Sequence, residues 1–320
     1  MVVDDALDFV LPRFSRHAWT SDAARDEWEP RIAKIRAALQ DLTLESVSRG
    51  MRACGLIQAR DSEMDAVVSR CADRGIVVVP IERQASPKST ASVTATYALE
   101  ALVCEPLPSG MATAVVSRSA NMESMGAAWD RGACAEVAAL LGYPSCCGRF
   151  VVGIVDERRL DATWSVAQNS DQNAIDPSYI SIGAEPETNP LWAPLGITLL
   201  PHIPCNFGCA ASRQVGRMRV DLARAMGYES EIGWMQEVLS WPVQWSALHG
   251  IAETKTPILK MVARTDATAR KHTLDWQGAG QPESAAPGLS FPHQPPRRLK
   301  ISDSRSFQRG LANTDSASSH

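Results

Sequence analysis

The sequence lacks any long run of basic residues. Its 320 residues carry 32 Lys and Arg against 36 Asp and Glu, which gives a formal net charge of −4. The densest basic stretch, PPRRLK at 295–300, lies in a polar region near the C-terminus. Proteins that bind nucleic acids usually gather Lys and Arg on one face to neutralise phosphates. We therefore expect no nucleic-acid partner.

Long apolar runs are also missing. No stretch reaches the roughly 18 apolar residues that indicate a transmembrane helix. The N-terminal stretch MVVDDALDFVLPRF contains acids where a secretory signal would carry basic residues,. We therefore expect no membrane partner and a cytoplasmic location. In such a reducing compartment, the eight cysteines are expected to be thiols or metal ligands rather than disulfides,.

Several familiar catalytic motifs are absent. The sequence contains no GxGxxG or GxxxxGK loop, which would indicate a nucleotide site,. It contains neither a GxSxG nucleophile turn nor an HExxH zinc helix,. These absences leave the cysteines as the main chemical signal.

The composition is that of a globular protein, with 45% hydrophobic and 21% charged residues,. We expect a single globular domain over residues 1–276, with a possible subdivision near residue 118. Residues 277–320 are rich in Gly, Pro and Ser and are expected to form a partly disordered extension,.

Hydrophobic periodicity gives the expected elements. It predicts helices over residues 20–40, 61–74 and 119–142, and another helix starting at Ser145,. The β-branched run at 75–82 predicts a buried strand, and ATAVVSRS at 112–119 predicts a second strand,. The expected fold class is α/β or α+β, with a small mixed sheet in the N-terminal half and a mainly helical C-terminal half.

Four of the cysteines form two pairs. Cys146 and Cys147 follow a proline in LGYPSCCGRF, and Cys205 and Cys209 stand in PHIPCNFGC. If Cys205 starts a helix, Cys209 lies on the same face one turn later, with Cβ atoms about 5–6 Å apart. The expected helix start near Cys146 would lower thiol pKa values, and the thiolate is the form that binds metals.

The pairs together predict a metal site made of Cys146, Cys147, Cys205 and Cys209. Because neighbouring side chains diverge, we expect one of Cys146 and Cys147 to be a ligand. The other is then a fourth ligand or a reactive thiol. An iron–sulfur cluster is the first expectation and zinc the second. The remaining cysteines are expected to be small buried apolar residues: Cys54, Cys71, Cys104 and Cys134,.

Candidate acid–base residues lie near these motifs. Cys147 is a candidate reactive thiol, and His202, three residues before Cys205, could ligate or move a proton,. On a helix, His249 and Glu253 would share one face and could form an acid–base pair. Each could equally be structural. The charged stretch 254–268 is a candidate contact for an anionic substrate, with solvated charges as the alternative.

The stretches LLGYPSCCGRFV and HIPCNFGCAAS resemble an uncharacterised prokaryotic family. That family has an LGYP-x-CC segment and a downstream H-x-P-C-x-x-x-C-x-x-S segment. The resemblance covers these two stretches and the helix before the first. It implies that they form one site, and it implies no reaction. The matching residues are Leu141, Gly142, Tyr143, Pro144, Cys146, Cys147, His202, Pro204, Cys205, Cys209 and Ser212.

The sequence thus predicts a cysteine-ligated metalloenzyme that acts on a small, possibly anionic, molecule. Lyase or dehydratase chemistry, sulfur transfer and redox chemistry all remain open. Two other functions are compatible with the cysteines. One is a metal-free thiol/disulfide redox protein, and the other is a non-catalytic module with a structural zinc site. The oligomeric state is not predicted.

Overall fold

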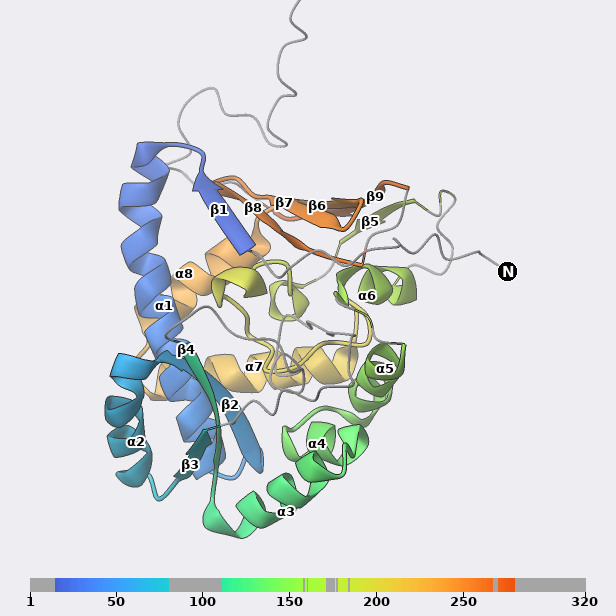
Figure 1. The fold of residues 1–320 in the computed structure, drawn as a ribbon. Coiled ribbons are helices and arrows are strands. Elements are labelled where there is room, and N and C mark those ends of the chain that lie inside the picture. Colours follow the sequence, from blue (N-terminus) through green and yellow to red (C-terminus); the bar gives the residue numbers. More distant parts are fainter. Residues whose placement is uncertain are drawn as a thin grey trace, which may run out of the picture.

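The computed structural model describes residues 15–80 and 111–279, apart from residues 158, 160, 171–175, 177, 184 and 267–269. The chain forms a mixed α/β fold with two separate sheets. Figure 1 shows the larger sheet at one end of the molecule and the smaller one at the other. Cys104 and almost all of the expected C-terminal extension lie outside the described residues.

The larger sheet has six strands in the order β1-β8-β7-β6-β9-β5. Neighbouring strands are antiparallel except β5 and β9, which are parallel. Side chains alternate between buried and partly exposed along β6, as expected for strands that cover a core with one face,. The strands are β1 (Ser15–Trp19), β5 (Tyr179–Ile182), β6 (Val243–Leu248), β7 (Ile251–Lys255), β8 (Leu259–Arg264) and β9 (His272–Trp276).

The smaller sheet has three antiparallel strands in the order β2-β4-β3. They are β2 (Cys54–Arg60), β4 (Met111–Ser117) and β3 (Val77–Pro80). The helix α2 (Met64–Ala72) packs on this sheet and buries Val67 and Cys71 in a small apolar cluster. The long helix α1 (Asp22–Ser48) contacts strands of both sheets and so connects the two ends of the fold (Figure 1).

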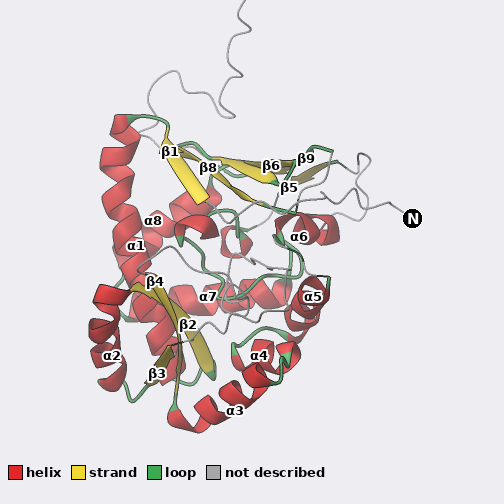
Figure 2. Cartoon of the chain, viewed as in Figure 1, coloured by secondary structure: helices red, strands yellow, loops and turns green. Residues whose placement is uncertain are grey.

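Most of the remaining helices lie between the two sheets or beside them, as Figure 2 shows. The main core fills the space between the six-stranded sheet and these helices and includes the buried indoles of Trp28, Trp192 and Trp241. The other helices are α3 (Ser119–Asp130), α4 (Cys134–Leu140), α5 (Ser145–Asp156), α6 (Thr163–Ser170), α7 (Ala210–Ala225) and α8 (Glu229–Ser240), with short 3-10 turns η1 (Asp61–Glu63), η3 (Pro186–Thr188) and η4 (Ala193–Leu195).

The expected distribution of helix and strand is wrong. The main sheet lies in the C-terminal half, where the sequence predicted mainly helix, while helices dominate the N-terminal and middle parts. The error comes from the tryptophan-rich segment after residue 240. Its buried residues, Val243, Trp245 and Ala247, follow the two-residue period of a strand rather than a helical period,.

Individual elements also differ from the expectation. The helix predicted over residues 20–40 continues to Ser48 in α1, with Pro30 inside it. The helix expected over 119–142 is divided into α3 and α4, and the break contains Gly132 with a φ of 65°. The strand β3 forms where expected but is not buried, because it lies at an edge of its sheet and leaves Val77 and Val79 exposed. The helix starting at Ser145 is confirmed.

Within the described residues, no helix is long and apolar enough to cross a membrane.

Candidate metal centre

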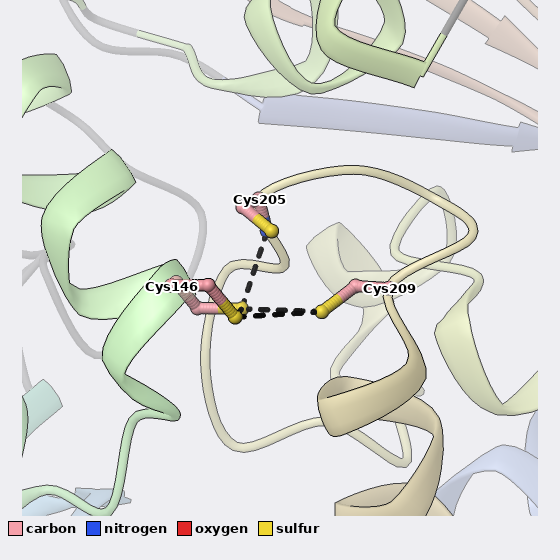
Figure 3. Close-up of side chains that lie close together, drawn as sticks. Cys146, Cys205 and Cys209 are labelled. Atoms are coloured by element: carbon pink, nitrogen blue, oxygen red, sulfur yellow. Dashed lines mark hydrogen bonds between the residues drawn. The ribbon is translucent and has the colours of Figure 1, made fainter.

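The four paired cysteines converge on one point. Their Sγ atoms all lie within 4.8 Å of one another. Cys146 Sγ is 3.8 Å from both Cys147 Sγ and Cys209 Sγ, and Cys147 Sγ is 3.7 Å from Cys209 Sγ. Figure 3 shows the side chains from α5 facing those from the loop before α7. The sequence prediction that these four residues form one site agrees with this geometry.

The first two cysteines are positioned by a turn between two helices. Gly142 adopts a φ of 79° after the end of α4, a conformation that favours glycine, and Pro144 directly precedes α5,. Cys146 and Cys147 therefore lie in the first turn of α5. Their sulfurs point into the same group of four, so the expectation that neighbouring cysteine side chains diverge is wrong here.

The other two cysteines reach the site through a loop. Cys205 does not start a helix, because α7 begins at Ala210 and Cys209 is its N-cap residue. The predicted one-turn helical spacing is therefore wrong, although the two residues do come together. The loop is fixed by neighbouring side chains. Asn169 Nδ2 donates to the Cys205 carbonyl at 2.6 Å, and Thr188 Oγ1 donates to the Phe207 carbonyl at 2.6 Å.

Nitrogen donors of the loop surround the sulfurs. The backbone N–H of Cys205 donates to Cys147 Sγ at 3.3 Å, and the N–H of Ser212 donates to Cys209 Sγ at 3.5 Å. Asn206 Nδ2 lies 3.5 Å from Cys205 Sγ. Donors of this kind favour the thiolate over the thiol, since they stabilise the charged sulfur. Three of the four sulfurs thus accept a hydrogen bond that offsets part of the cost of charging them in a buried site.

A short polar chain leads away from the sulfurs. Ser212 Oγ lies 3.2 Å from Cys147 Sγ and 2.8 Å from His202 Nε2, and both Ser212 and His202 are buried. Burial, and then the positive charges of Arg52 and Arg219, lower the pKa of His202 to about 3. The imidazole is therefore neutral at physiological pH, and the tautomer with a hydrogen on Nε2 would donate to Ser212 Oγ and leave the hydroxyl hydrogen for Cys147 Sγ,.

The thiols differ in acidity before a metal ion is considered. Burial raises the pKa of Cys147, against the expectation that the helix start would lower it. Burial, with the neighbouring Cys209 thiol, raises the pKa of Cys205 to about 11. Burial also opposes ionisation of Cys209, but donors from Ser212 and the other cysteines outweigh it and lower its pKa to about 7. A bound cation would favour all the thiolates.

The sulfur spacing fits a single metal ion. In a tetrahedral site with metal–sulfur bonds of about 2.3 Å, neighbouring sulfurs stand about 3.8 Å apart. The three sulfur–sulfur distances among Cys146, Cys147 and Cys209, 3.7 to 3.8 Å, match this tetrahedral spacing. Three of the sulfurs therefore already stand at tetrahedral spacing, and Cys205 Sγ lies within 4.8 Å of each of them, so that all four residues could hold a metal ion.

The predicted acid–base pair of His249 and Glu253 does not join this site. His249 is exposed in the turn between β6 and β7, with a φ of 50°, and Glu253 lies on β7. The helix on which both were expected to share a face does not exist. Glu253 instead pairs with Lys255 and Lys260, and these two contacts lower its pKa although partial burial opposes the shift.

The isolated cysteines stand apart from the four. Cys54 and Cys71 are fully buried in apolar clusters, as expected, and Cys134 is partly buried at the start of α4. Two functional candidates carried little signal in the sequence. Ser212, three residues after Cys209, is indicated only as the last residue of the H-x-P-C-x-x-x-C-x-x-S segment. Arg219, buried seven residues further along α7, gave no signal at all.

Comparisons with protein-family models, with curated proteins and with solved structures found no match to this chain.

Proposed function

We propose that this protein is a cysteine-ligated metalloenzyme that acts on a small molecule. The observation that carries the proposal is the spacing of the four sulfurs, which all lie within 4.8 Å of one another in the interior of the fold. Membership in the family with the LGYP-x-CC and H-x-P-C-x-x-x-C-x-x-S segments is part of the proposal, because the motif residues surround this one point.

A single ion is favoured over an iron–sulfur cluster. Inorganic sulfides lie between the irons of a cluster, so its cysteine sulfurs stand further apart than in a mononuclear site. The distances of 3.7 to 3.8 Å among Cys146, Cys147 and Cys209 suit the mononuclear case,. Zinc, the second expectation from the sequence, therefore becomes the first. Zinc does not change oxidation state, which favours lyase or dehydratase chemistry over redox chemistry.

The four ligands have different surroundings. Cys147, Cys205 and Cys209 are buried and each accepts a hydrogen bond from nitrogen or from Ser212. Cys146 is only partly buried, and in the described part of the chain its sulfur has hydrogen-bonding contacts with the other sulfurs but none with a nitrogen or hydroxyl donor. We assign Cys146 as the exchangeable ligand that yields its position to substrate. Catalytic sites differ from structural ones by such a position.

The protein's own residues then have distinct roles. A bound ion supplies Lewis acidity and favours the thiolate form of its ligands. With Cys147 as a metal-bound thiolate, Ser212 would donate its hydroxyl hydrogen to Cys147 Sγ and stabilise the negative charge on that sulfur,. His202 positions Ser212 through Nε2, and its low pKa makes it a poor proton acceptor at neutral pH,. We therefore assign His202 to positioning rather than to proton transfer.

Metal analysis of single cysteine variants tests this assignment. Cys205→Ser is expected to lose the metal, because a buried ligand with a fixed loop has no substitute. Cys146→Ser is expected to keep about one ion per chain but to release it faster to a chromophoric chelator. Cys134→Ser is the matched control, a partly buried cysteine outside the site, and should behave as wild type.

Three outcomes would contradict the proposal. Equal metal content in wild type and Cys205→Ser would refute the ligand set. Unchanged release from Cys146→Ser, with a fold that collapses on chelation, would instead support the structural zinc module. A metal-free wild type in which thiol titration finds a disulfide among these four residues would support the thiol redox protein.

A further inference from the structure

Two buried arginines lie near His202, which joins the cysteine site through Ser212. Arg52 stands in the loop between α1 and β2 and is 8% exposed, and Arg219 on α7 is 5% exposed. Neither forms an ion pair with an acid in the part of the chain that the structure describes. Burial of a guanidinium without a counter-charge is costly, so such a residue usually has an anionic partner.

Arg219 is the less satisfied of the two. Its Nε and Nη1 atoms are buried and have no hydrogen-bond partner among the described residues. Arg52 Nε donates to the Cys54 carbonyl at 2.6 Å, which fixes the side chain but does not balance its charge. Burial, and then the charge of Arg52, lower the pKa of Arg219 to about 9, so both groups stay charged at neutral pH.

The two guanidinium groups lie near His202, the residue whose polar chain leads to the metal centre. Both charges act on His202, whose Nδ1 is also buried without a partner. Ser212 and Arg219 lie two turns apart on the same buried face of α7, about 10 Å along its axis,. Side chains of a helix lean towards its N-terminus, which brings the Arg219 guanidinium towards His202 and Ser212.

The loop that carries Arg52 is held against the site. A Cβ on Gly142 would meet Arg52 Cβ at 3.1 Å, so this loop packs on the turn that positions Cys146 and Cys147. The tyrosine of the same turn, Tyr143, has its ring centroid 5.2 Å from that of His202. Residues from α7, the α1–β2 loop and the α4–α5 turn therefore meet at one place, beside the polar chain that ends at Cys147.

We propose that Arg52 and Arg219 bind the dianionic group of the substrate, a phosphate or dicarboxylate, with His202 between that group and the metal centre. Each guanidinium is a planar group of donors that can bind two oxygens of a phosphate or carboxylate, and two such groups balance two negative charges. The assignment of this anion as substrate rests on the proposed function of the metal centre. The proposal that an anion binds to these two arginines is independent of that function.

Binding of inorganic phosphate and of malonate to the full-length protein as purified tests the proposal. Each anion is titrated at constant ionic strength against sodium chloride, with heat of binding and thermal unfolding as readouts. Wild type should bind at least one of them saturably and unfold at a higher temperature when it is bound. Preference for phosphate or for malonate then identifies the kind of dianion.

Arginine variants locate the binding. Arg219→Met should weaken binding by at least about thirtyfold, the scale for truncation of a buried charged partner. Without anion it should be no less stable than wild type, because it removes an unpaired buried charge. Arg217→Met is the matched control on the same helix, since its side chain is 60% exposed and pairs with Glu185. It should bind as wild type does. Arg52→Met provides a second test if Arg219→Met does not fold.

Other results would overturn the proposal. Absence of saturable binding, an equal effect of chloride, or unchanged affinity in both Arg219→Met and Arg52→Met would each refute the anion site. Metal loss in Arg219→Met, with no anion bound by wild type, would assign the arginines to charge balance of the thiolates instead. Metal content measured on the same samples separates the two proposals. Metal-free wild type that binds phosphate refutes only the metalloenzyme, and metal-loaded wild type that binds neither anion refutes only the anion site.

Discussion

Replacement of Ser212 by alanine removes the group that joins the metal centre to His202. The hydroxyl lies 3.2 Å from Cys147 Sγ and 2.8 Å from His202 Nε2, and all three residues are buried. The variant leaves both ring nitrogens of His202 without a partner, since Nδ1 has none in the described structure. An unpaired buried polar group costs about 1–3 kcal/mol, so the free energy of unfolding should fall by about that amount.

The same variant should weaken metal binding. Groups that hydrogen-bond to a metal ligand typically contribute about 10- to 100-fold in affinity. Competition with a chromophoric chelator measures this change, and urea unfolding of the metal-loaded protein measures the stability. Ser46→Ala is a matched control, because its buried Oγ donates only within its own helix, to the Thr43 carbonyl at 2.8 Å. A metal affinity equal to that of wild type, or an equal loss in Ser46→Ala, would refute the role given to Ser212.

Two further predictions concern the turn and the histidine beside the site. Gly142→Ala should lower the free energy of unfolding by about 1–2 kcal/mol, since φ is 79° and the new Cβ meets Arg52,. Gly132→Ala, with a φ of 65° and open space around it, should cost less in urea unfolding, and an equal cost would contradict close packing at Gly142. The folded pKa of His202, about 3, lies below its ordinary 6.5, so the unfolded chain takes up a proton first as pH falls. Metal-free wild type should therefore lose about 2 kcal/mol more stability than His202→Gln between pH 7 and pH 5, and equal losses would argue against a buried neutral histidine.

The four cysteines of the site could be predicted from the sequence because they stand in two short stretches, LGYPSCCGRF and PHIPCNFGC. The helix predicted to start at Ser145 forms as α5, and Cys146 and Cys147 lie in its first turn. The convergence of this turn with Cys205 and Cys209 could be inferred only from shared chemistry. Its geometry could not be inferred, because the loop before α7 is shaped by contacts from Asn169 and Thr188 that lie far away in sequence.

The large sheet was missed for a different reason. Bulky apolar residues such as Trp241 and Trp245 satisfy either a helical or a strand pattern over a short window. The discriminating signal was the pair His249–Gly250, which forms a two-residue turn with φ values of 50° and 78° between β6 and β7,. The burial of Arg52 and Arg219 also could not be predicted from the sequence, because no local pattern distinguishes a buried arginine from a solvated one.

X-ray absorption at the edge of the metal that co-purifies with the protein tests whether the four cysteines hold a single ion. We expect four sulfur neighbours at about 2.3 Å around one zinc ion and no second metal nearby. A short metal–metal distance would show a cluster and contradict the single-ion geometry derived from the sulfur spacing. A shell of nitrogen and oxygen atoms, or no metal in the protein as purified, would contradict the assignment of Cys146, Cys147, Cys205 and Cys209 as ligands.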